Sequence, residues 1–135
     1  MIKSLLFLLL LSNALFGQHL YIIHGRSGSI GENSLRLNDV DESVVYFTED
    51  EERRAGTMPL TEFLVRWAHE EAFGQKPPIG HFVSFAPAGP AFNEQSFIIQ
   101  HPRYNKADET LIFMIEGKEI KKQKLGEVTL YLSHE

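Results

Sequence analysis

The stretch Val128–Leu132, with the sequence VTLYL, alternates apolar side chains with side chains that carry a hydroxyl group. Successive side chains of a strand point to opposite faces of a sheet, so this alternation predicts a half-buried β-strand. We expect Val128, Leu130 and Leu132 to face a core and the residues between them to face outward. The stretch indicates that the chain folds mainly as β-structure.

Similar short runs precede this strand. Leu20–Ile23 is apolar on both faces, as in an inner strand, and Leu35 and Leu37 alternate with polar neighbours. Four further runs are β-branched, aromatic or alternating, namely Val44–Phe47, His81–Ala86, Ser96–Gln100 and Leu111–Ile115. We therefore predict about seven short antiparallel strands, arranged as a β-sandwich or an open barrel.

Turn residues separate several of these runs. Gly25–Ser29 (GRSGS) is expected to end the first strand as a flexible polar loop, and it lacks the spacing of a nucleophile elbow. Asp39–Glu42 is expected to form a polar turn. Glu116–Glu119 is typical of a tight hairpin turn because Gly117 can adopt a positive φ.

One segment, residues 59–73, has helical rather than strand periodicity. Its apolar residues recur at helical spacing, at Leu60, Phe63, Leu64, Trp67 and Ala68. Pro59 suits the first turn, Thr57 can cap it, and Gly74 followed by Pro77 and Pro78 is a stop signal. This pattern predicts one amphipathic helix, and packing on the sheet is favoured over an exposed partner-binding face.

The N-terminus has the features of a secretory signal peptide. Lys3 provides a positive charge, Leu5–Leu11 is apolar, and small residues follow at Ser12 and Ala14. The apolar run is too short for a transmembrane helix, which needs about 20 residues. We expect residues 1–17 to be a signal peptide cleaved after Ala14 or Gly17, leaving residues 18–135 as a single β-rich domain without a transmembrane anchor. The location predicted is the bacterial periplasm or the exterior.

The composition excludes several function classes. The net charge of −5 disfavours a general nucleic-acid or anionic-lipid partner. The chain has no cysteine, which excludes disulfides and thiol chemistry. Lys118, Lys121, Lys122 and Lys124 cluster near the penultimate turn, and we interpret them as a charged edge that discourages aggregation.

No motif for catalysis or for a cofactor emerges. The six histidines contain no His-x-x-x-His pair, so we predict no dedicated metal site. The acidic runs Asp39–Glu42 and Glu49–Glu52 are typical of solvated turns, and neither has the glycine and distal glutamate of an EF-hand loop. We accordingly expect no catalytic, metal-binding or cofactor-binding residues.

Residues 44–86 carry an ordered set of motif residues. In chain order they are Tyr46, Phe47, Ala55, Gly56, Phe63, Trp67, Pro77 and Pro78. This order resembles a family of small exported prokaryotic proteins, without an assigned activity, that carries Tyr-Phe-Ser-Asp-Arg-Pro, Arg-x-Ala-Gly-x-Met, Phe, Trp and Pro-Pro motifs. The chain departs from that pattern where Thr48 and an acidic run replace Ser-Asp-Arg-Pro, and where Ile79 and Gly80 replace Asn-Ala. The resemblance implies a compact β-rich domain with one helix and does not imply an enzyme.

Two interpretations of the motif residues are open. In the first, Tyr46 and Phe47 end a strand, Ala55 and Gly56 form a close turn, and Trp67 docks the helix on the sheet as a structural clasp. In the second, a ligand groove lies beside Trp67 and is rimmed by Arg53 and Phe82, which makes these two residues the candidates for binding.

Three functions follow from these observations. The leading hypothesis is an exported, non-catalytic module with a protein partner in the cell envelope, such as a component of a larger envelope or secretion assembly. The alternative is a stand-alone periplasmic binder of a small ligand or metal ion. The third hypothesis is a hydrolase whose residues converge only in three dimensions.

Overall fold

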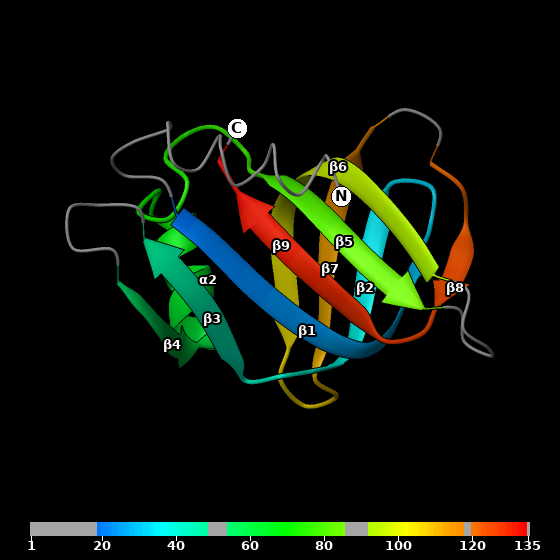
Figure 1. Cartoon of the computed structure of the whole chain (residues 1–135), viewed down its shortest axis with the longest axis horizontal. Coiled ribbons are helices and arrows are strands. Elements are labelled where there is room, and N and C mark those ends of the chain that lie inside the picture. The colour runs from blue at the N-terminus through cyan, green and yellow to red at the C-terminus, as the bar shows by residue number, and fades with distance from the viewer. Residues whose placement is uncertain (1–18, 49–53, 86–91, 118–119, 135) are drawn as a thin grey trace.

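The computed structural model describes residues 19–48, 54–85, 92–117 and 120–134, which form one helix and nine strands. Chain order and bounds are β1 (His19–Ile30), β2 (Ser34–Val40), β3 (Ser43–Thr48), β4 (Ala55–Pro59), α2 (Leu60–Ala68), β5 (Ile79–Phe85), β6 (Phe92–Asn105), β7 (Thr110–Glu116), β8 (Gln123–Leu125) and β9 (Val128–Ser133) (Figure 1).

Six of the strands close into an antiparallel barrel. The pairing runs from β1 through β2, β7, β6, β5 and β9 and returns to β1. Strands β3 and β4 extend the sheet beyond β1, and β8 pairs with the far end of β1. The predicted β-rich architecture with one helix is confirmed, and of the two predicted arrangements the chain forms a barrel, which closes on itself.

Strand β1 continues through the segment that we expected to be a loop. Gly25 pairs with Val40 on one side and Val128 on the other, and Gly28 pairs with Leu37 and Leu125. A Cβ atom at Gly28 would lie 2.5 Å from the backbone oxygen of Arg36. The prediction of a flexible loop was wrong because these glycines serve close strand packing rather than a turn.

The barrel interior is filled by apolar side chains from every wall. The residues between Val128 and Leu132 alternate as predicted, with Val128, Leu130 and Leu132 fully buried. Phe82 of β5 stacks on Phe97 of β6 with ring centroids 5.8 Å apart. The interior is therefore a packed core, in which Ser84 of β5 is a fully buried polar residue.

The helix is shorter than predicted. It covers Leu60–Ala68, and residues 69–75 form turns in which Glu70 and Gly74 adopt positive φ values of 62° and 67°. Thr57 lies within β4 and does not cap the helix, whose N-cap is Pro59. The Leu60 N–H instead donates to the Glu42 carbonyl oxygen at 2.6 Å, which ties the helix start to the β2–β3 connection.

Aromatic side chains join the helix to the barrel. Phe63 is fully buried and lies 4.5 Å from the Tyr21 ring of β1. Trp67 is half-buried, with ring centroids 5.1 Å from Phe73 and 5.9 Å from Phe113 of β7. Burial raises the pKa of the Tyr21 hydroxyl above its ordinary value, partly offset by the positive charge of Arg66. These aromatic rings therefore come both from the helix and from the barrel strands that it contacts.

Four other motif residues, Tyr46, Phe47, Ala55 and Gly56, lie in strands and do not all face the same way. Ala55 and Gly56 belong to β4 instead of a close turn. Gly56 pairs with Tyr46, and a Cβ atom there would lie 2.9 Å from the Tyr46 hydroxyl, so the glycine leaves room for that ring. Phe47 points to the outside and is 42% exposed. Tyr46 and Phe47 therefore contribute to different faces of the sheet.

The connection after β7 also differs from the prediction. Strand β7 pairs with β2 and β6, whereas the next strand, β8, pairs with β1. The predicted hairpin at Glu116–Glu119 was wrong because the two flanking strands join different neighbours. Residues 118 and 119 lie outside the described part of the chain.

We expect Trp67→Ala to lower the free energy of unfolding by about 2–4 kcal/mol, because the indole fills the contact between α2 and β7. Val65→Ala on the same helix is the matched control, since Val65 is 57% exposed, and should change stability by less than about 0.5 kcal/mol. Urea unfolding followed by circular dichroism measures both values. Equal stability of the two variants would contradict the docking role of Trp67.

Gly28→Ala should destabilise the barrel by about 2 kcal/mol or more, because its new methyl group meets rigid backbone at Arg36. Gly31→Ala is the control, since its Cβ atom would meet only the Ser34 hydroxyl, which can rotate away. Thermal unfolding compares the two variants. A Gly28→Ala protein that melts with the wild type would show that β1 and β2 are not so closely packed.

The raised pKa of Tyr21 predicts an alkaline dependence of stability. The neutral phenol is favoured in the folded state, so its contribution is complete below pH 10 and is lost as the pH rises through the folded-state pKa. Tyr21→Phe should remove this contribution to the loss of stability at alkaline pH. Urea unfolding of both proteins between pH 8 and pH 11 tests it, and identical pH profiles would refute it.

Candidate functional site

The outside of the barrel carries apolar side chains on five neighbouring strands. Alternation places one set of residues inward and the other outward on β3, β1, β9, β5 and β6. We define the outer apolar face as Leu20, Ile22, Val45, Phe47, Ile79, Val83, Ile98 and Tyr131. Of these, Phe47, Ile98 and Val45 are the most open, at 42%, 39% and 37% exposure, and the others are half-buried.

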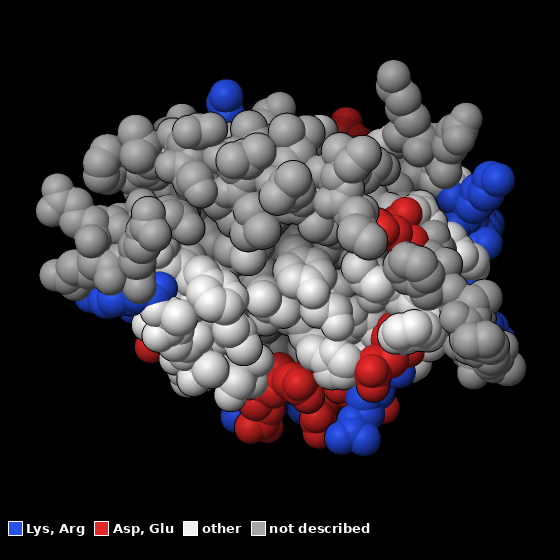
Figure 2. Space-filling view, viewed as in Figure 1, with Lys and Arg blue, Asp and Glu red and all other residues white. Residues whose placement is uncertain are grey.

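Strand register assembles this face from distant parts of the sequence. Across the strands, Phe47 pairs with Leu20, and Leu20 pairs with Ser133. Ser133 also pairs with Ile79, which in turn pairs with Ile98. A second row runs beside the first, from Val45 through Ile22 and Tyr131. Figure 2 shows this side of the molecule: where the surface is not grey, uncharged side chains lie over β3, β1 and β9. Acidic side chains gather instead at the lower pole.

A serine, a histidine and a carboxylate meet at the β5–β6 side of the face. His81 Nδ1 lies 2.7 Å from Ser96 Oγ, and His81 Nε2 lies 2.9 Å from a Glu94 carboxylate oxygen. This order of groups resembles a nucleophile, a base and an orienting acid. However, the His81 and Glu94 side chains are 40% and 42% exposed, and neither described hollow includes any of the three residues. The arrangement orients His81 on an open sheet surface, where water is not excluded.

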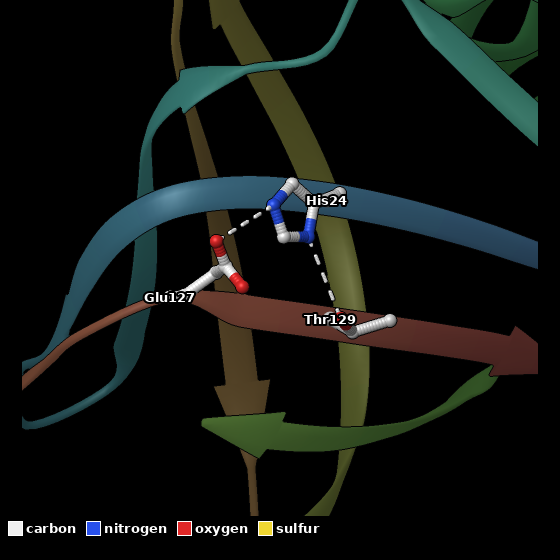
Figure 3. A network of polar contacts seen from close by, with 3 residues as sticks. All are labelled: His24, Glu127 and Thr129. Carbon is white, nitrogen blue, oxygen red and sulfur yellow. Dashed lines mark hydrogen bonds and ion pairs between the residues drawn. The ribbon is translucent and has the colours of Figure 1, made fainter. Parts of the chain in front are cut away.

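A second histidine lies on the β1–β9 side. His24 Nδ1 is 3.4 Å from Thr129 Oγ1, and His24 Nε2 is 3.7 Å from a Glu127 carboxylate oxygen (Figure 3). Thr129 and His24 are directly paired across the two strands. These contacts fix the imidazole along the border of the outer apolar face.

A groove lies beside Trp67, as one of the two interpretations of the sequence predicted. It holds about 400 Å³ between α2, the turns after it and the middle of β6. Its lining includes Trp67, Gln75, Lys76, Gln100 and His101. His101 sits at an irregularity in β6, where the register shifts between Gln100 and Arg103.

The backbone beside this groove is strained. Glu70 and His101 have positive φ values of 62° and 51°, and Gly74 has 67°. Such conformations cost energy in residues other than glycine and concentrate at functional sites. All three residues line the groove. No hydrogen bond to the Trp67 indole N–H is found within the described residues.

A second hollow, at the lower pole, is almost entirely polar. It is lined by Arg26, Asp39, Val40, Asp41, Glu42 and Glu109. Asp39 and Glu109 also have positive φ values, of 49° and 55°. Throughout the described ranges, no three His, Asp or Glu side chains are close enough to hold a metal ion. The hollow is thus lined mainly by acidic residues.

The two predicted binding residues do not form one site. Phe82 is fully buried inside the barrel, so its prediction as the rim of a groove was wrong: it belongs to the inward set of β5. Arg53 lies outside the described residues. Pro77 is exposed and lines the groove, whereas Pro78 is buried.

The outer apolar face was missed at the level of sequence, although one signal pointed to it. Leu20–Ile23 is apolar on both faces, which fits an inner strand, but β1 has only one face on the core. The second apolar face therefore belongs to the surface. Within the described residues, no helix is long and apolar enough to cross a bilayer.

No family model matches the chain, and neither a curated protein nor a solved structure was found to be similar to it.

Proposed function

We propose that the protein is an exported, non-catalytic module of the bacterial cell envelope that binds another protein through its outer apolar face. The observation that carries the proposal is the row of Phe47, Leu20, Ile79 and Ile98, interrupted by Ser133 between Leu20 and Ile79, on the outside of a barrel whose interior is already filled. A protein partner buries such a face, because contiguous exposed apolar surface is unfavourable in water.

The composition of the face suits a protein partner. Aliphatic and aromatic side chains form most of it, His24 stands at its margin, and His81 lies between Ile79 and Val83 on β5; each histidine has a carboxylate neighbour. Interfaces between proteins commonly combine apolar and polar side chains in this way. The signal-peptide features of residues 1–17 support the envelope as the location, in the periplasm or outside the cell.

A small-ligand binder is the second candidate, because the groove beside Trp67 combines an aromatic ring with polar side chains. Gln75, Lys76 and His101 line it together with Trp67, whose indole N–H has no partner in the described structure. Small-molecule sites combine apolar walls with a few polar groups in this way. A ligand-dependent rise in melting temperature that Trp67→Phe abolishes would support this second function.

The first function is tested with Ile98→Lys, which places a charge in the outer apolar face. Its control is Val65→Lys, since Val65 is 57% exposed on α2, which contributes no residue to that face. Proteins that co-purify from solubilised envelope are identified, and the recovered partner is titrated with each purified variant. We expect Ile98→Lys to weaken binding at least about tenfold, because a charge is desolvated at the interface, and Val65→Lys to bind as the wild type.

Two results would contradict the proposal. One is equal affinity of the wild type and Ile98→Lys for every recovered partner. The other is a Val65→Lys variant that loses binding to the same extent as Ile98→Lys, which would show that the partner responds to net charge and not to this face. Melting temperatures of the three proteins show whether each variant is folded.

A further inference from the structure

Strand β4 is an open edge of the sheet. It pairs with β3 and stands at the end of the strand order, and Figure 1 shows it at the outer margin of the molecule. Its sequence, Ala-Gly-Thr-Met-Pro, has no charged residue, although charged side chains are the usual protection of an edge strand. Only Pro59, at its end, can limit pairing with another strand.

The hydrogen bonds at both ends of β4 determine which backbone groups face outward. The Thr48 N–H donates to the Arg54 carbonyl oxygen at 2.8 Å, so Arg54 points towards β3. The Leu60 N–H points the same way, because it donates to the Glu42 carbonyl oxygen. Backbone direction alternates along a strand, so the N–H and C=O groups of Ala55 and Thr57 point away from β3, together with the C=O of Pro59.

Pro59 provides an independent check of this assignment. Proline has no N–H and is tolerated at edge strands where its nitrogen faces away from the neighbouring strand. By the same alternation, the backbone nitrogen and carbonyl group of Pro59 point away from β3, like those of Ala55 and Thr57. The free edge of β4 therefore offers two donors, at Ala55 and Thr57, and three acceptors.

We propose that β4 pairs antiparallel with β4 of a second copy of the chain, about a two-fold axis through Thr57. In that register each Thr57 N–H donates to the Thr57 carbonyl oxygen of the other copy. Each Ala55 N–H donates to the carbonyl oxygen of Pro59 of the other copy. Every outward donor then has an acceptor. Because Pro59 has no N–H, its position adds no donor that would stay without a partner.

The side chains around the axis favour the same pairing. The two Thr57 side chains lie directly opposite each other, a cross-strand pair that stabilises antiparallel sheets. On β3, Val45 pairs with Thr57 and Phe47 pairs with Ala55, so they lie on the same face of the sheet. Val45 and Phe47 are both exposed. A continuous sheet through both copies places these apolar side chains on the same face as those of the second copy. No like charges meet, because β4 carries none.

This assembly goes beyond the proposed function, because it uses the edge of the sheet and a copy of the same chain. Four hydrogen bonds over five residues form a small contact, so the dimer should be weak and concentration-dependent. Its presence or absence is measured without any other partner. Failure of this dimer would leave the Ile98→Lys test of the outer apolar face unaffected.

Sedimentation velocity of the purified protein from about 10 µM to 1 mM tests the proposal. We expect a rise in mean mass towards the dimer for the wild type and for Thr57→Val, which keeps the backbone N–H and a β-branched side chain. Thr57→Pro removes one outward donor, and Thr57→Lys places two like charges on the axis. Both should remain monomeric over the whole range.

Amide exchange in the wild type gives a second readout that needs no variant. The Ala55 and Thr57 amides should exchange more slowly at 1 mM than at 10 µM, whereas the Gly56 and Met58 amides, which face β3, should not change. A wild type that is monomeric at 1 mM overturns the proposal. It is also overturned by dimers that Thr57→Lys leaves intact, or by exchange at Ala55 and Thr57 that is independent of concentration.

Discussion

Strand β1 hydrogen-bonds with four other strands, and the rest of the structure depends on this shared pairing. On one edge its first half pairs with β9 and its end with β8; on the other edge it pairs with β3 and then with β2. The change of partners occurs at Gly25 and Gly28, where a side chain would collide with Leu37 or the backbone of Arg36. One continuous strand thereby closes the barrel and also carries the β3–β4 extension.

The extension in turn positions the helix and divides the surface. Pro59 ends β4 and α2 begins at the next residue, so the helix contacts β3 and β4, and Phe63 and Trp67 join it to Tyr21 of β1 and Phe113 of β7. The opposite face of β3 then stays continuous with the outside of the barrel. A filled interior and a docked helix leave three surfaces for function: the outer apolar face, the groove beside Trp67 and the free edge of β4.

Part of this structure could be predicted from the sequence, because local alternation reports which side of a strand is buried. The strand at Val128 and the helix stripe at Phe63 and Trp67 are of this kind. The glycines of β1 misled the prediction, since glycine in a strand and glycine in a turn look alike until the neighbouring strand is known. Helix length was overestimated because the stop signal at Gly74 and the two prolines lies beyond the actual helix end at Ala68, and residues 69–75 form turns.

The candidate sites were harder to predict than the fold, since they depend on register between distant strands. Phe82 was predicted at the rim of a groove, because the aromatic character of a residue alone does not say which face of β5 it occupies. His81, Glu94 and Ser96 come together only through the pairing of β5 with β6. The outer apolar face likewise needs five strands in register, and no short segment contains it.

The seam between β1 and β9 has a consequence for the time course of folding. These strands belong to opposite ends of the described chain, with His24 contacting Thr129 across 105 positions. The barrel can therefore close only after β9 has left the ribosome, and contacts of such long sequence separation form slowly. During that interval the chain stays unfolded, which would suit the export that we propose, because a narrow secretion pore passes unfolded chains.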